Sequence, residues 1–290
     1  MSNETRSHKD NVFCLLYRDK KNLLSLYNAM NDTSYGEEEE LEVVTLDGAI
    51  CMKIKNDAAF VIDSMLNLYE QQASVNPNMP LRDLYYVARE LKKIAPPRSL
   101  YSTMKVEIPV PKFVVFYNGT AKQPERQEYR LSDLFSRAEE NPELELRVTV
   151  ININPGYSEN LLKRCESLKG YMVFVEKVRG KRKAGIKLES AVLQALEECI
   201  SENILAEFFR ENREEVVEMS IWEFDQELHD KTLLEDGEAI GLEKGIEKGI
   251  EKGTLKAIKN IMSTLKLTAE QAMTALRIPE TDKRKYADRL

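Results

Sequence analysis

The stretch Lys55-Asn-Asp-Ala-Ala-Phe-Val-Ile-Asp-Ser-Met-Leu-Asn-Leu-Tyr-Glu-Gln-Gln72 decides the fold, because it holds two apolar runs separated by a short polar dipeptide. Runs of this length, rich in β-branched and aromatic residues, predict two strands. If Asp63–Ser64 is a two-residue hairpin loop, Ile62 pairs with Met65 and every other pairing follows. A slip of one residue would move each side chain to the other face, so the prediction depends on this loop.

The predicted register brings two carboxylates together. Asp57 falls directly opposite Glu70, at a Cβ separation of about 4.5–5.5 Å, and Gln72 lies on the same face as Glu70. Like charges at this distance are destabilising unless a divalent cation between them reverses the interaction. Carboxylate and amide oxygens suit a hard cation such as Mg²⁺. The alternative is that Asn56–Asp57 is a turn dipeptide and Glu70 an exposed strand residue.

The chain around the hairpin has the pattern of a mixed α/β domain. Two continuous apolar strands flanked by helices predict a sheet covered on both faces. The predicted helices span residues 8–30 and 81–93, the second just after Pro80, and the further strands span residues 41–46, 112–117 and 146–153.

The formal net charge of −7 over 290 residues is unevenly distributed. Residues 189–229 hold twelve acidic and two basic residues, in a pattern that predicts one or two amphipathic helices. Residues 1–188 carry a net charge of +2, so the acidic total does not argue against a nucleic-acid partner. The acidic segment could also cover a basic cleft as an autoinhibitor.

Several classes of protein and site are disfavoured. No apolar run is long enough to span a bilayer, and the polar start lacks the apolar core of a secretory signal, so we expect a cytoplasmic protein without a membrane partner. The four cysteines are widely separated, so we expect buried thiols rather than a zinc knuckle. With only two histidines, a catalytic triad is also disfavoured.

Two further segments each allow two structural interpretations. Six basic residues between Lys177 and Lys187 could contact phosphate or form a solvated linker. The tail repeats Gly-(Leu/Ile)-Glu-Lys from Gly241 to Gly253, and its glycines would weaken an isolated helix by roughly 4 kcal/mol in total. The repeat could be a flexible tether, or a helix whose small-residue groove packs against another helix, including that of a second copy.

An aspartate followed by a Glu-x-polar triplet on the next strand resembles the PD-(D/E)xK nuclease superfamily. The longer pattern is similar to the Rpn family of recombination-promoting nucleases, also described as putative transposases. The matching segments are Lys9-Asp10 with Phe13, residues 24–28, 55–57, 68–72 and 76–82 with Tyr85 and Tyr86, residues 111–119, and the glycine-spaced tail.

This resemblance implies a restriction-endonuclease-like core and a Mg²⁺-dependent DNA endonuclease active in recombination, transposition or phage defence. It implies that Asp57, Glu70 and the carbonyl of Gln71 hold the metal. The superfamily's lysine position is occupied by Gln72, which can orient a water but cannot supply a positive charge. The proline that usually precedes the aspartate is replaced by Asn56.

We therefore predict a nuclease-like domain at residues 1–180, an acidic helical segment at 181–236 and a helical tail at 237–290. The residues expected to contact DNA are Arg82, Lys181, Arg182 and Lys183. Arg82 could instead pair with Asp83 or a surface carboxylate, and Tyr85 and Tyr86 are more typical of a core than of base stacking. Two other functions stay open, a catalytically weak DNA-binding or regulatory protein and a helical interaction scaffold.

Overall fold

A computed structural model describes residues 11–36, 57–62, 64–95, 97–287 and 290. The chain divides into two compact units, Met1–Glu227 and Leu228–Leu290, and the long helix α8 contributes to both. The helices and strands, in chain order, are α1 (Val12–Tyr17), α2 (Lys20–Asn31), β1 (Asp57–Ile62), β2 (Met65–Gln72), α3 (Met79–Ile94), η1 (Pro97–Tyr101), β3 (Val110–Tyr117), β4 (Arg126–Arg130), η2 (Leu131–Leu134), β5 (Arg147–Asn152), α4 (Glu159–Arg164), α5 (Glu166–Lys183), α6 (Leu188–Ser201), α7 (Ala206–Glu211), α8 (Arg213–Leu265), α9 (Ala269–Ala275) and α10 (Glu280–Ala287).

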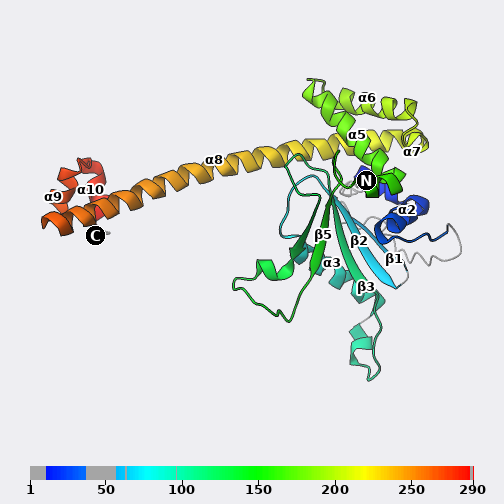
Figure 1. Ribbon diagram of the computed structural model, residues 1–290, viewed down its shortest axis with the longest axis horizontal. Helices are drawn as coiled ribbons and strands as arrows, with labels where there is room; N and C mark the ends of the chain where they lie inside the picture. The colour runs from blue at the N-terminus through cyan, green and yellow to red at the C-terminus, as the bar shows by residue number, and fades with distance from the viewer. Residues whose placement is uncertain (1–10, 37–56, 63, 96, 288–289) are drawn as a thin grey trace, which may run out of the picture. The chain divides into compact units, whose positions relative to one another are not determined.

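The first unit is an α/β domain built on a mixed five-stranded sheet in the order β1-β2-β3-β5-β4 (Figure 1). The strands β2, β3 and β5 run parallel, and β1 and β4 are antiparallel edge strands of this sheet. The predicted α/β class with a central sheet flanked by helices is therefore confirmed.

The register of the β1–β2 hairpin agrees with the prediction. Ile62 pairs with Met65, and Asp57 pairs with Glu70. Ser64 has a φ of 59°, the left-handed conformation that two-residue hairpin loops require. Asp63, the other predicted loop residue, and the strand predicted at residues 41–46 lie outside the described residues.

Each face of the sheet carries its own apolar core. Alternate residues of β2 and β3, among them Tyr69 and Phe116, belong to one apolar core with residues of α1, α2, α5 and α6. The intervening residues, among them Leu68 and Val115, pack under α3. Because successive side chains of a strand point to opposite faces, this alternation separates Gln71 from its neighbours Glu70 and Gln72.

Two predicted elements differ from the structure. The helix expected over residues 8–30 is two helices, because Arg18 ends α1 and the Asp19 side chain caps α2 by accepting from the backbone N–H of Asn22 at 2.9 Å. Residues 177–183 lie in helix α5 rather than in a linker. The predicted strands at 112–117 and 146–153 and the helix at 81–93 are confirmed, with small shifts of their ends.

The second unit has a small core of its own. The end of α8 packs against α9 and α10 through Ile258, Met273 and Tyr286. Thr268 and Gln271 form a reciprocal capping box at the start of α9. Among the described residues, no helix has the length and apolar content needed to cross a membrane.

Three of the four cysteines, Cys14, Cys165 and Cys199, are buried as expected, and Cys51 lies outside the described residues. Burial raises the pKa of the Cys199 thiol to about 11. A thiol with a raised pKa is a poor nucleophile near neutral pH, which fits its place in the core.

Candidate active site on the β1–β2 hairpin

Glu70 is the centre of a polar cluster on the face of the sheet that α3 covers. Its side chain is only 5% exposed and accepts a hydrogen bond from Gln72 Nε2 at 2.8 Å. A second donor is Arg82 Nη2, which forms an ion pair with the same carboxylate oxygen, Oε1. Strand alternation therefore brings Glu70 and Gln72 together as predicted, and a helix adds the cation.

The position of Arg82 follows from the first turn of α3. Pro80 lies near the start of this helix, where its missing N–H and fixed φ are favourable. Arg82 then reaches β2, and its Nε donates to the Tyr86 hydroxyl, one turn later, at 2.8 Å. The guanidinium carbon also lies 5.5 Å from the centroid of the Tyr86 ring. These two contacts hold the guanidinium against Glu70.

Asp83, which the sequence offered only as a possible partner of Arg82, is a further member of the cluster. Its side chain is buried beneath α3. Burial, and to a smaller extent the neighbouring Glu70 carboxylate, raise the pKa of Asp83 to about 8, although the Arg82 guanidinium opposes the shift. Near neutral pH this carboxyl group is therefore mostly protonated and neutral. A helix beginning at Met79 would have placed residues 79, 82, 83 and 86 on one face, which is the signal that could have identified it.

The predicted metal-binding residues are brought together in part. Asp57 and Glu70 are register partners, but only the backbone of Asp57 is described. Gln71 points its side chain to the other face, where its amide accepts from Asn11 Nδ2 at 2.9 Å and donates to Asn118 Oδ1 at 2.7 Å. Among the described side chains, no group of three or more His, Cys, Asp or Glu residues could hold a metal ion.

The hydrogen bonds of Gln71 belong to a buried polar chain behind β2. Asn118 Nδ2 donates to the Tyr171 hydroxyl at 3.4 Å, and this hydroxyl donates to Glu223 Oε1 at 3.2 Å. Burial and the Glu223 carboxylate both raise the pKa of Tyr171, so the phenol keeps its proton. The chain runs from α1 through β2 and β3 to α5 and the beginning of α8.

The basic residues predicted on α5 lie apart from Glu70, because α5 and α3 cover opposite faces of the sheet. Lys181 forms an ion pair with Glu198 of α6. Arg182 donates to the carbonyl of Ile186 at 3.0 Å, and Lys183 is exposed. Earlier in α5, Arg179 is buried and donates to the carbonyl of Asn118. Much of this basic segment thus has partners within the protein.

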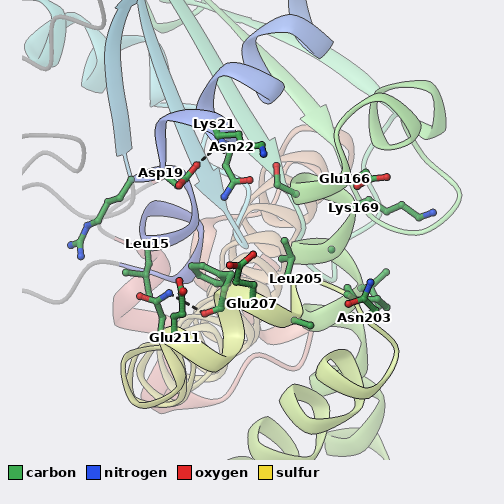
Figure 2. A pocket seen from close by; sticks show the side chains of 18 of the residues that line it. Leu15, Asp19, Lys21, Asn22, Glu166, Lys169, Asn203, Leu205, Glu207 and Glu211 are labelled. Atoms are coloured by element: carbon green, nitrogen blue, oxygen red, sulfur yellow. Dashed lines mark hydrogen bonds between the residues drawn. The ribbon is translucent and has the colours of Figure 1, made fainter. Parts of the chain in front are cut away.

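A cavity of about 1070 Å³ lies in the helical layer, lined by residues of α1, α2, α5, α7 and α8. Figure 2 shows side chains of both charges around it, including Lys21, Lys169, Glu207 and Glu211. None of the site residues predicted from the sequence lines this cavity. The cavity and the Glu70 cluster are therefore separate features of the fold.

The Glu70 cluster offers an anionic oxygen, a cation, an amide and a neutral carboxyl group within one patch of the sheet. Such a set can bind a cation or a phosphate and can orient a water molecule. Comparison of the chain with protein-family models, with curated proteins and with solved structures found no match in any of the three.

Proposed function

We propose that this chain is a divalent-metal-dependent DNA endonuclease with a restriction-endonuclease-like core, similar to the Rpn family of the PD-(D/E)xK superfamily. The observation that carries the proposal is the pairing of Asp57 with Glu70 across the β1–β2 hairpin. The mixed sheet and the location of Gln72 beside Glu70 also support it. The oxygen donors present at this hairpin fit a hard cation such as Mg²⁺.

In this proposal Asp57, Glu70 and the carbonyl of Gln71 hold the ion. The chemistry such an ion supplies when bound is a lowered pKa for a coordinated water and neutralisation of phosphate charge. Gln72 would orient the attacking water through its amide. Arg82, at the partly exposed rim of the cluster, would hold a phosphate oxygen as Glu70 turns toward the cation.

Cleavage of supercoiled plasmid DNA tests this function directly. We expect nicking in Mg²⁺, no nicking in EDTA, and loss of nicking by at least 100-fold in Glu70→Gln. The control is Glu128→Gln on the edge strand β4, which removes an exposed carboxylate that pairs with Arg130 and should leave cleavage unchanged. Equal cleavage by the wild-type chain and Glu70→Gln would contradict the proposal.

A second candidate function is binding of DNA without efficient cleavage. The observation that favours it is the Glu70–Arg82 ion pair, because a carboxylate already neutralised by a guanidinium has less charge to offer a metal ion. Magnesium titration followed by calorimetry separates the two candidates. Metal binding that Glu70→Gln abolishes favours the nuclease, and DNA binding without metal binding favours the second candidate.

The tail is proposed to join two copies of the chain. Ile246 and Ile250 are more than half exposed on α8. A methyl group added to Gly245, Gly249 or Gly253 would meet no atom within 4 Å. These residues leave a narrow, apolar side of the helix open to close approach by another helix. A dimer would also suit an enzyme that cuts both strands of a duplex.

A further inference from the structure

The segment between α3 and β3, residues 97–110, is an exposed arm of the first unit. Figure 1 shows it projecting beyond the end of the sheet at which β3 begins. It starts with the short helix η1 and contains Leu100, Tyr101 and Met104, whose exposed fractions are 68%, 90% and 78%. Apolar side chains this exposed, and this close in sequence, mark a surface that contacts a partner.

Exposed basic residues lie close in sequence to these apolar side chains. Arg98 and Lys105 lie on the arm, and Arg89 and Lys92 lie on the outer face of α3 that leads to it; all four are exposed. The same α3 face carries Tyr85, which is 68% exposed and therefore not the core residue that the sequence predicts. We name the arm together with these α3 residues the arm surface. It combines cations with exposed rings, the combination that proteins use to hold a nucleic-acid backbone and stack on its bases.

Acidic residues contribute little to the arm surface. Residues 88–110 contain five basic and two acidic residues. One of the two, Glu90, is buried and accepts from Lys93 Nζ at 2.9 Å through both carboxylate oxygens. The other, Glu107, is exposed. The positive charge of the surface thus faces solvent, which favours a polyanion over a protein partner of mixed charge.

The arm surface also stands at a suitable distance from the Glu70 cluster. Val110, at the end of the arm, pairs with Met65, and Val115 pairs with Glu70. Five residues of strand separate the two positions, roughly 17 Å at about 3.3 Å per residue. Helix α3 covers the same interval, with Arg82 near Glu70 and Lys92 near the arm. This interval corresponds to about five base pairs of a duplex lying along α3, at 3.4 Å each.

We propose that the arm surface binds duplex DNA, with Arg98 and Lys105 on phosphates and with Tyr101 and its apolar neighbours in contact with the bases of a groove. The inference rests on the proposed function for the identity of the ligand, but its site is distinct from the Glu70 cluster. Apolar side chains of exposed arms can wedge between base steps of a bent duplex, and a tyrosine ring can stack on an unstacked base.

The test is a fluorescence-anisotropy titration of a 30-base-pair duplex in EDTA, so that cleavage cannot occur, at several NaCl concentrations. The variants are Arg98→Ser/Lys105→Ser and Tyr101→Ala. The charge-matched control is Lys163→Ser/Lys169→Ser, which removes two exposed lysines from the helices on the opposite face of the sheet. Every substituted side chain is exposed, so the fold is expected to be retained.

We expect Arg98→Ser/Lys105→Ser to reduce the slope of log K against log [NaCl] by about two. Tyr101→Ala should weaken binding roughly fivefold or more without changing this slope. The control pair should match the wild-type chain. Wild-type affinity in both arm variants, or an equal loss in the control pair, would overturn the proposal. So would an arm variant that changes only the oligomeric state measured by light scattering, because the arm would then join copies of the chain.

Plasmid cleavage by the same variants separates this proposal from the proposed function. Two results together support both the nuclease and the arm surface: Glu70→Gln binds the duplex normally but does not cut, and the arm variants bind it more weakly. Glu70-dependent cleavage with unchanged binding by the arm variants overturns only the arm surface. Arm-dependent binding without any Glu70-dependent cleavage overturns only the nuclease.

Discussion

Arg82 on α3 and Glu70 on β2 form an ion pair on a nearly buried face of the sheet, with the guanidinium also bonded to the Tyr86 hydroxyl. The Glu70 side chain is 5% exposed and that of Arg82 is 29% exposed. A carboxylate at this depth is stable as an anion only when its charge is balanced, by the guanidinium or by a bound cation.

Replacing Arg82 alone should therefore destabilise the metal-free protein. We expect Arg82→Gln to lower the free energy of unfolding by about 2–3 kcal/mol at pH 7, less than for a fully buried pair because Arg82 reaches solvent. The double variant Glu70→Gln/Arg82→Gln should recover part of the loss. Urea denaturation of the wild-type chain, the two single variants and the double variant measures the coupling energy between Glu70 and Arg82. Strictly additive effects on the free energy of unfolding would show that the pair contributes nothing.

Asp83 should make stability depend on pH between about 4 and 8. Its folded pKa of about 8 lies above the ordinary aspartate value, so the folded protein binds more protons than the unfolded chain in this window. Stability contributed by the neutral carboxyl is fully present below pH 4 and falls as the pH rises to 8. Asp83→Asn cannot ionise and should escape this loss.

The measurement is the free energy of unfolding of Asp83→Asn and of the wild-type chain in EDTA, from pH 4 to pH 8.5. We expect the free energy of unfolding of Asp83→Asn, relative to that of the wild-type chain, to rise by several kcal/mol between pH 4 and pH 8.5. The upper bound is about 5 kcal/mol, because each pH unit contributes at most about 1.4 kcal/mol. The exposed Asp133→Asn serves as control. A difference that stays constant with pH would contradict the buried, neutral state of Asp83.

Gly119 should tolerate no side chain. A Cβ atom there would lie 1.8 Å from the carbonyl oxygen of Ala73 and 2.6 Å from the Tyr117 hydroxyl oxygen. The carbonyl belongs to the backbone just after β2 and cannot move without disturbing the sheet, so Gly119→Ala should cost about 3 kcal/mol or more. Gly180→Ala, in α5 with open space around it, should instead stabilise by about 0.5–1 kcal/mol. Thermal unfolding of both variants gives the comparison.

The glycine repeat predicts opposite effects on helix stability and on assembly. Gly245→Ala/Gly249→Ala should stabilise α8 by about 0.8–1 kcal/mol for each substitution, because glycine is a poor helix former and the added methyl groups meet no atom. If two copies approach along this side, the same methyl groups should weaken self-association. Circular dichroism and sedimentation equilibrium measure the two effects, and unchanged self-association would argue against glycine-mediated contact.

The hairpin was predictable because its information is local. A two-residue loop between two apolar runs fixes the pairing of Ile62 with Met65, and the Asp57–Glu70 pair follows by counting. The buried strand β3 was equally clear, because a continuous apolar run needs no partner to be recognised. The strand β4 carries Arg-Gln-Glu-Tyr-Arg at an edge of the sheet, where polar residues discourage further pairing, so it gave no apolar signal.

The parts that were missed depend on contacts between distant segments. Arg179 and Lys181 belong to the basic segment that the sequence predicts either to contact phosphate or to form a linker. In the structure Arg179 donates to the Asn118 carbonyl and Lys181 pairs with Glu198, and neither partner can be inferred from local composition. The sequence offers Asp83 only as an ion-pair partner for Arg82. Its burial depends on how α3 is rotated about its axis over β2, which the sequence reveals only when the first turn of the helix is located correctly.

The polar chain behind β2 has a direction. Asn11, Gln71 and Asn118 each donate through the amide nitrogen to the next member, and the Tyr171 hydroxyl donates to the Glu223 carboxylate. Reversing any single amide would set donor against donor or acceptor against acceptor, and the chain cannot reverse as a whole because the Glu223 carboxylate only accepts. The hydrogen bonds of five residues, spread over more than 200 positions of sequence, thus all run in the same direction. They hold strand β2, which presents Glu70 on one face of the sheet, from its other face, and they end on α8.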